Sequence, residues 1–253
     1  MICPERTDAV IILPCKYWTP KPKEIVTISI INKSTNLVSE DPEKYIIMVD
    51  KFLEYAEYKR RISFNSKNNW KFRILFFKNQ KVSALINYCK LDEAKKLIDE
   101  LLDEVNIQQS QENKSDLYIF ILSNYISVLL HLEKFEEAKR NIDIMENILK
   151  TPRKNMEVFN RLLKYMRMQL FVLHEDFEKG GQYLNELMAQ NDNPSQKGYL
   201  LLYMGIYHYK RREKEKAQKC FDEASSTLKA PHSIKMIEHY RELLDNEIYE
   251  INK

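Results

Sequence analysis

Glycine is scarce in this chain, with four residues among 253. Compact sheet proteins use glycine where turns take positive φ, and nucleotide-binding folds use it in loops that approach a phosphate closely. The sequence contains no G-x-x-x-x-G-K-[ST], G-x-G-x-x-G, G-x-S-x-G or H-E-x-x-H motif. These absences argue against a nucleotide-binding or compact β fold, and they favour a helical protein.

Paired cysteines, strong charge and long apolar runs are missing as well. The four cysteines form no C-x-x-C pair and have no histidine at metal-ligand spacing, as is typical of isolated thiols in a reducing compartment. A net charge of +3 is too small to predict nucleic-acid binding by itself. No apolar run approaches the roughly 18 residues of a membrane span, and Glu5 and Asp8 stand where a signal peptide carries positive charge. We therefore expect a soluble, intracellular, cytoplasmic protein without a membrane span.

The first 40 residues differ from the rest of the chain. Two β-branched runs, DAVIILP (8–14) and EIVTISII (24–31), are typical of strands or extended segments. Pro20 and Pro22 between them exclude a helix. We predict an extended or β-containing N-terminal arm over residues 1–40, packed on the body of the protein. An alternative is that an exposed strand of the arm pairs with another protein.

From Asp41 onward the periodicity is helical. Asp41 can accept the free amides of a first turn, and Pro42 suits the first helical position. Apolar residues then recur at three- and four-residue spacing: Tyr45, Met48, Val49, Phe52 and Ala56. The sequence thus predicts an all-α domain over residues 41–253.

Four stretches of this domain predict antiparallel helix pairs. In each, an apolar helix is followed by a short polar turn and by a second helix that opens with acidic residues, which suit its N-terminal dipole. The turns are CKLDEA, HLEKFEEA, HEDFEKG and KRREKEKA. Each second helix carries a small residue early on, where two helices can approach closely. These marker residues are Ala94, Ala138, Gly180 and Ala217, and together they indicate an internal repeat.

The copy LLYMGIYHYKRREKEKAQKCFDEA, residues 201–224, resembles the tetratricopeptide repeat. The large, large, small and aromatic positions of that motif's first helix are matched by Leu201, Met204, Gly205 and His208. Its second helix is matched by Ala217, Phe221 and Ala224. Gly205 and Ala217 would then be the contact points of the pair. The resemblance covers roughly residues 68–228, and it is weaker in the copies before this one.

The resemblance implies a right-handed superhelix of helix pairs whose concave face, lined by first helices, binds peptides or partner proteins. The clamp by which one subclass holds a C-terminal carboxylate is matched only at Asn124. Carried onto this chain, the groove would present Phe76, Asn79, Ser83, Phe120, Ser123, Asn124, Ser127, Tyr165, Gln169, Leu202, Ile206 and Tyr209.

A basic and aromatic stretch, Tyr58 to Lys81, offers a second hypothesis. It contains eight basic residues and no acidic one. Basic groups contact phosphates and aromatic rings stack on bases, so an RNA contact is an alternative. The competing interpretation, which the helical spacing favours, is that the aromatic residues face the core while the basic side chains reach water. The candidate contacts are Arg60, Arg61, Lys67, Trp70 and Lys71.

Catalytic and metal-binding patterns are lacking. His131 and His174 occupy the same corner of two helix pairs, where a polar residue that ends a helix is the ordinary interpretation. We therefore expect neither an enzyme nor a bound metal or cofactor. Methionines gather around the third pair and predict core packing, with an adaptable binding surface as the alternative: Met156, Met166, Met168 and Met188.

An amphipathic segment from His232 predicts a C-terminal helix that caps the array or docks a partner subunit. As a whole, the sequence predicts a non-catalytic scaffold or adaptor subunit of a larger complex, which binds a partner protein or peptide. The alternatives are a peptide-sensing regulatory receptor and an RNA-contacting subunit.

Overall fold

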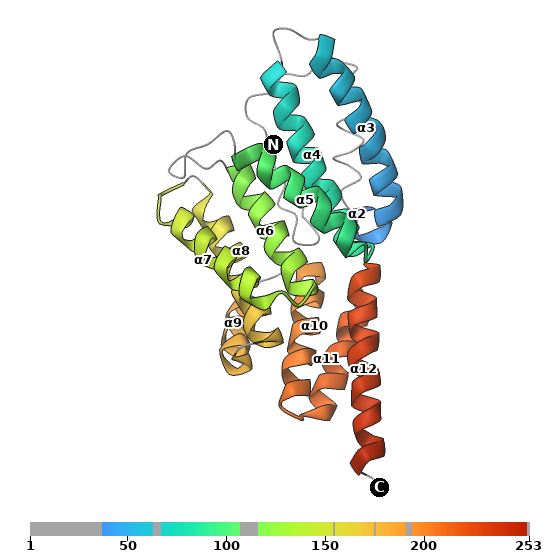
Figure 1. Cartoon of the computed structure of the whole chain (residues 1–253). Coiled ribbons are helices and arrows are strands. Elements are labelled where there is room, and N and C mark those ends of the chain that lie inside the picture. Colours follow the sequence, from blue (N-terminus) through green and yellow to red (C-terminus); the bar gives the residue numbers. More distant parts are fainter. Residues whose placement is uncertain are drawn as a thin grey trace.

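The computed structural model describes residues 37–62, 67–106, 116–153, 155–174, 176–190 and 194–251 (Figure 1). Within these ranges the chain is helical and has no β-strand, so the expected all-α class is confirmed for them. The expected arm, with its strands at 8–14 and 24–31, lies outside the described residues. Among the described residues the first helix is α2 (Leu37–Glu40), which lies just before the boundary at residue 41 that the sequence predicts.

Helix α3 (Pro42–Ile62) starts where the sequence predicts. The side-chain Oδ1 of Asp41 accepts a hydrogen bond from the backbone amide of Lys44 at 3.1 Å, which is the geometry of a helix N-cap. α3 packs along α4 (Lys67–Asn87), with α2 beside both. The cluster between them contains large side chains of both long helices, including Tyr45, Phe52, Trp70 and Phe77.

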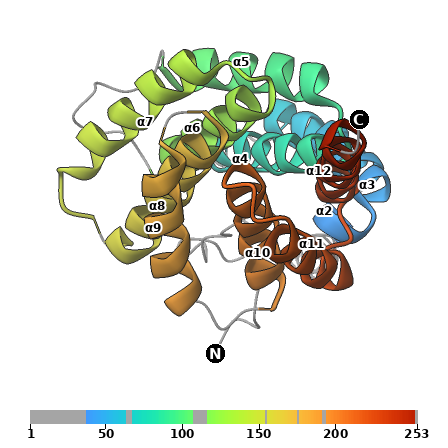
Figure 2. The same ribbon diagram turned by 90° about the horizontal axis from the view of Figure 1, so that it is seen from below.

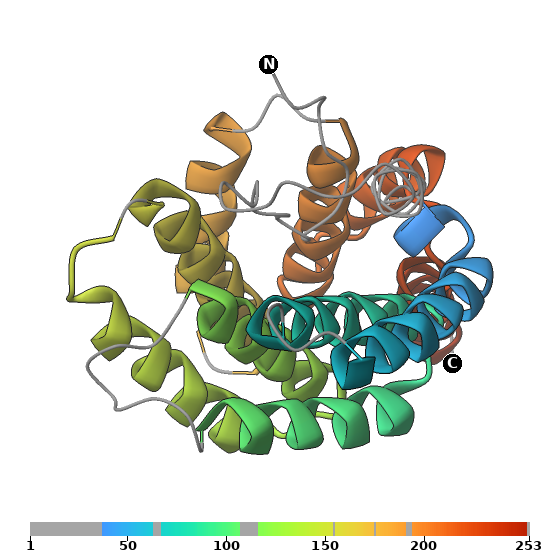
Figure 3. The same cartoon turned by 90° about the horizontal axis from the view of Figure 1, so that it is seen from above.

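The rest of the array consists of helix pairs. These are α4 with α5 (Leu91–Asn106), α6 (Asp116–His131) with α7 (Phe135–Leu149), α8 (Met156–Leu173) with α9 (Phe177–Ala189), and α10 (Pro194–Lys210) with α11 (Lys214–Thr227). The second helices α5, α7 and α9 also contact the first helix of the next pair. Seen from below and from above, the pairs follow one another around a curve, with α4, α6 and α10 nearer its centre than α5 and α7 (Figures 2 and 3).

Three of the turns share one backbone geometry. Cys89, Glu133 and Arg212 have φ values of 63°, 57° and 59°, in the left-handed region. The amides of Glu133 and Lys134 donate to carbonyl oxygens in the last turn of α6 at 3.2 and 2.8 Å, and equivalent bonds close the other two turns. This is the Schellman arrangement of a helix end. Because it recurs at the same position ahead of each alanine marker, the internal repeat of the sequence is also a repeat of structure.

Small residues lie where the two helices of a pair approach closely. All four marker residues are buried. A Cβ atom at Gly205 would overlap the ring of Phe221, so this glycine makes room in α10 for an aromatic side chain of α11. The glycine within an apolar run is therefore a packing requirement, as expected from the spacing.

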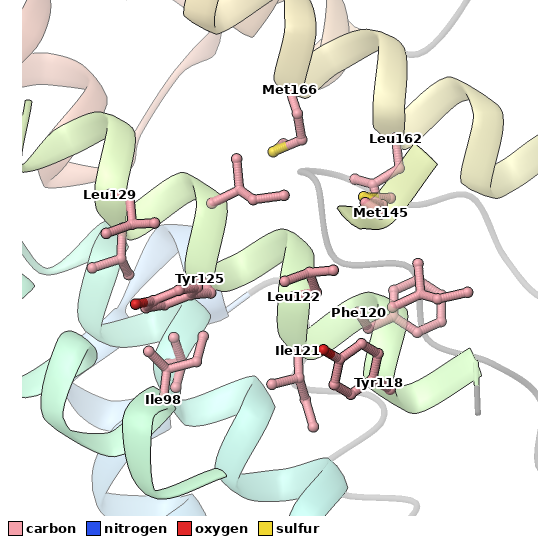
Figure 4. Close-up of a cluster of buried hydrophobic side chains, with 14 of the residues drawn as sticks. Ile98, Tyr118, Phe120, Ile121, Leu122, Tyr125, Leu129, Met145, Leu162 and Met166 are labelled. Carbon is pink, nitrogen blue, oxygen red and sulfur yellow. The ribbon is translucent and has the colours of Figure 1, made fainter. Parts of the chain in front are cut away.

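Helix α6 is enclosed on almost all sides. Its neighbours α5, α7 and α8 join it in one apolar cluster, in which Ile98, Met145 and Met166 lie around side chains of α6 such as Leu122 and Tyr125 (Figure 4). A helix that is apolar all round is explained here by burial within the array. Among the described helices, none combines the length and the apolar character needed to cross a membrane.

The last helix, α12 (Pro231–Ile251), lies against α10 and α11 and reaches α4 at its N-terminal end. Its Ile237 and Leu244 are buried in the cluster formed with α8 to α11. α12 therefore covers apolar surface of the last pair, which is the position of a terminal cap in a helical repeat.

Candidate partner-binding face

The side chains predicted to line a groove come from the first helices of four successive pairs. α4, α6, α8 and α10 contact one another in that order, so the helices that carry these residues are neighbours across the array. We call this set of residues the first-helix face. Its members are Phe76, Asn79, Ser83, Phe120, Ser123, Asn124, Ser127, Tyr165, Gln169, Leu202, Ile206 and Tyr209.

Side-chain amides and a hydroxyl join α4 to α6 within this face. Asn124 donates through Nδ2 to the Oδ1 of Asn79 at 2.9 Å and to its backbone oxygen at 3.3 Å. Ser83 donates through Oγ to the Oδ1 of Asn124 at 3.3 Å. Asn79 and Ser83 are buried, and a buried polar group is costly unless it is hydrogen-bonded. The network therefore fixes the position of α4 against α6.

Further polar contacts join α6 to α8 and α8 to α10. The Oγ of Ser127 lies 3.7 Å from the Sδ of Met166. Gln169 donates through Nε2 to the hydroxyl of Tyr199, and that hydroxyl lies 3.3 Å from the hydroxyl of Tyr203. Burial, and after it the neighbouring Tyr199 hydroxyl, raises the pKa of Tyr203 well above its ordinary value. Tyr203 therefore stays a neutral donor and acceptor throughout the physiological range.

Two buried glutamines leave an acceptor without a partner. The Oε1 atoms of Gln80 and Gln169 make no hydrogen bond, although each side chain is only 2% exposed. A buried acceptor without a hydrogen bond costs about 1–3 kcal/mol of stability. A donor placed close to either oxygen would therefore stabilise the protein. Gln80 was not among the residues that the sequence singled out.

The members of the first-helix face differ in accessibility. Leu202 and Ile206 have no exposed surface and belong to the apolar cluster around α10, so they pack the core, contrary to the expectation that they contact a partner. The polar and aromatic members that are also buried are Asn79, Ser83, Phe120, Ser123 and Gln169. The partly exposed members, which stay candidates for partner contact, are Phe76, Asn124, Ser127, Tyr165 and Tyr209.

The methionines around the third pair are mainly core residues. Met166 and Met168 are buried, and Met156 and Met188 are partly buried against the two large apolar clusters. Core packing therefore accounts for them.

The aromatic residues of the basic stretch differ in burial: Trp70 and Phe77 are buried, whereas Tyr58 and Phe72 are exposed. Trp70 is 3% exposed and lies edge-on to Tyr55, with ring centroids 6.0 Å apart. The guanidinium group of Arg73 lies 4.4 Å from the centre of the Trp70 ring. Trp70 is therefore not free to stack on a base, contrary to the RNA hypothesis, because it fills the contact between α3 and α4.

The basic candidates of this stretch lie near the end of α3 and in the first turns of α4. Arg60 pairs with Glu57 on the same helix at 2.8 Å. Arg61 is exposed near the end of α3, Lys71 is half-buried on α4, and Lys67 is the first residue of α4.

A partly buried histidine pair joins α12 to α6. The Nε2 of His232 lies 3.0 Å from the Nδ1 of His131, so one ring donates to the other. The Sγ of Cys89 lies 4.0 Å from the Nδ1 of His232. Burial, and then the neighbouring histidine, lowers the pKa of His131 well below its ordinary value; burial, and then Lys235, lowers the pKa of His232 to about 4. Both rings are therefore neutral at pH 7.

This pair could not be predicted from sequence patterns, because the two histidines are 101 residues apart. The sequence indicated a link between His131 and His174 only through their equivalent positions, and His174 instead stacks on Phe135 with ring centroids 4.3 Å apart. Over the described part of the chain, no three His, Cys, Asp or Glu side chains are placed to hold a metal ion together.

Comparison with protein-family models, with curated proteins and with solved structures finds no match for this chain. The function is therefore argued from the helical repeat and from the first-helix face.

Proposed function

We propose that this chain is a non-catalytic scaffold or adaptor subunit that binds a partner protein or peptide along the first-helix face. In this proposal the helix pairs form a right-handed superhelix like that of tetratricopeptide arrays. The free thiols of Cys89 and Cys220 suit a reducing compartment, so the cytoplasm is the location we propose.

One observation supports the proposal: α4, α6, α8 and α10 contact one another in order, and each carries at least one partly exposed polar or aromatic side chain. An extended partner segment can follow such a series of helices because each pair offers the next contact at a regular interval. Tyr165 and Tyr209 supply partly exposed aromatic surface, which is enriched at protein interfaces. Asn124 and Ser127 supply partly exposed polar groups on the same face.

A comparative pull-down tests this assignment. Wild-type protein is compared with a variant that carries Phe76→Ala, Tyr165→Ala and Tyr209→Ala together. A matched control carries Ile144→Ala and Ile234→Ala, which remove exposed apolar side chains from α7 and α12. Circular dichroism and thermal melting establish that all three are folded. We expect mass spectrometry to find the same stoichiometric partner with wild type and control, and to find it lost with the face variant. Equal retention by all three would refute binding at this face.

A short signalling peptide is the alternative occupant of the same face. A tight peptide stabilises the folded state by mass action, so a titration followed by thermal melting would reveal it. For RNA, the burial of Trp70 removes the main stacking candidate. RNA binding would still require a steep decrease of affinity with salt, and a decrease of that slope in Arg60→Ala and Arg61→Ala.

A further inference from the structure

Helix α3 ends the array and has one face that no described helix covers. Its neighbours are α4 and α2 (Figure 1). Large apolar side chains are exposed along it: Ile47 by 53%, Tyr55 by 38%, Tyr58 by 59% and Ile62 by 57%. On α4, α7 and α12 only single residues of this kind are exposed among those described, namely Phe72, Ile144 and Ile234. Exposed apolar surface gathered on one helix marks an interaction site more often than scattered residues do.

The exposed residues of α3 follow the spacing of a two-helix seam. Ile47, Lys51, Glu54 and Tyr58 are all exposed, and they are separated by alternating steps of four and three residues. Residues at these steps lie along one stripe of a helix and meet the same stripe of a partner helix. The seam is therefore a mixed one, with apolar residues at its two outer positions and opposite charges at its centre.

The order of these four residues is self-complementary. When a second copy of α3 is laid antiparallel about the middle of the seam, Ile47 lies opposite Tyr58 of the second copy, and Lys51 lies opposite its Glu54. A two-fold axis repeats both pairs, as an isologous interface requires. A parallel arrangement would instead place Lys51 against Lys51 and Glu54 against Glu54, which is repulsive. At each end, Arg61 lies opposite Lys44 of the second copy with Glu43 beside it, so these three groups leave one net positive charge at each end.

We propose that this protein forms a symmetric dimer in which the outward faces of two α3 helices pack antiparallel. The occupant is a second copy, because the charges and the apolar residues of this face complement the face itself. α3 has 21 residues and is therefore about 30 Å long. One helix face of this length forms a small interface, so we expect a dissociation constant on the order of micromolar.

Sedimentation velocity of the full chain over a range of concentrations tests the dimer. The mass of wild-type protein rises with concentration from 30.3 kDa toward twice that value. Ile47→Asp and Tyr58→Asp each place two charges in the seam and raise the dissociation constant about tenfold or more. The matched control is Ile144→Asp on α7, an isoleucine of similar exposure, which leaves association unchanged. Circular dichroism shows that each variant is folded.

Charge exchange distinguishes direct pairing from general damage to the surface. Lys51→Glu and Glu54→Lys each place like charges opposite one another and weaken the dimer. The double variant Lys51→Glu with Glu54→Lys restores both pairs in the antiparallel arrangement alone, and it therefore recovers the wild-type mass. A wild-type protein that stays monomeric at every concentration would overturn the proposal. Dimerisation of Ile47→Asp equal to wild type, or failure of the double variant to recover, would overturn it too.

Discussion

The two ends of the described array differ in how their terminal helices bury apolar side chains. At the C-terminal end, α12 buries Ile237 and Leu244 and brings His232 against His131 of α6. At the N-terminal end, α3 buries one face against α4 and leaves Ile47 and Tyr58 on the other face exposed. Both helices have 21 residues, so length does not cause the difference. A repeat array needs its last apolar surface covered, and here α12 covers one end, whereas no described helix covers the outward face of α3 at the other.

The largest loss of stability is expected at the C-terminal end of the array, which α12 covers. Ile237 is 1% exposed, so Ile237→Ala removes buried methyl groups and leaves a cavity. We expect a loss of about 2–4 kcal/mol in the free energy of unfolding, measured by urea denaturation. A loss below about 1 kcal/mol would mean that α12 contributes little to the fold, and the contrast between the ends would fail.

The second largest effect expected is a loss of stability in acid at the C-terminal end, where His131 and His232 meet. His131 and His232 have pKa values below those of the unfolded chain, with burial as the main cause. Two other groups lie near this pair. Cys89 lies at the turn between α4 and α5, and the positive charge of Lys235 on α12 disfavours protonation of His232. Because the unfolded state binds protons first, the stability from the neutral pair is present above about pH 6.5 and is lost as the pH falls toward 4. We expect a loss of about 1–3 kcal/mol.

Urea denaturation at a series of pH values between 5 and 7 measures this loss. His232→Gln is the matched variant, because an amide can still donate to His131 but does not titrate. Its stability should depend less steeply on pH than that of wild type. Identical slopes in the two proteins would show that the pair does not control the acid response.

A smaller effect is expected where α3 begins. Asp41 caps the helix through a bond to the amide of Lys44, a contact within one turn of the chain. Asp41→Ala should cost about 1 kcal/mol, and Asp41→Asn much less, because an amide oxygen can also accept that bond. Thermal melting of the two variants compares them directly. Equal melting temperatures would indicate that α3 does not depend on its cap.

The smallest loss of stability is expected on the outward face of α3. Ile47→Ala should change the free energy of unfolding by less than about 0.5 kcal/mol when the protein is dilute and monomeric, because the side chain is mostly in water. The comparison with Ile237→Ala is a like-for-like test of the two ends. A loss as large as at Ile237 would show that another part of the chain covers this face.

The local features of the fold could be predicted from the sequence. The start of α3 at Pro42 and the pairing of helices around Ala94, Ala138 and Ala217 follow from interactions within a few residues or one turn. The equivalent position in the third pair shows the limit of such reasoning. Gly180 aligns with the alanines, yet a Cβ atom there would lie 2.6 Å from Cγ2 and 2.9 Å from the backbone nitrogen of Val172, so alanine does not fit.

The accessibility of the candidate site could not be predicted in the same way. The resemblance placed Leu202 and Ile206 in the groove, but neighbouring helices leave them no exposed surface. The helical spacing of the basic stretch favoured aromatic residues that face the core, which is true of Trp70, because α3 packs against it, but not of Phe72, which is 39% exposed. Burial depends on which helix comes next in space, and a single helix pattern does not contain that information.

By itself, the sequence determined that the described chain is built of helices, where their pairs turn, and where small residues allow close approach. These are properties of neighbouring residues, for which 3.6-residue periodicity and turn geometry suffice. Three features follow instead from tertiary packing: His232 meets His131, parts of the predicted groove are core, and one face of α3 is covered by no described helix. Each of these depends on residues far apart in the chain, whose meeting is set by the packing of the whole array.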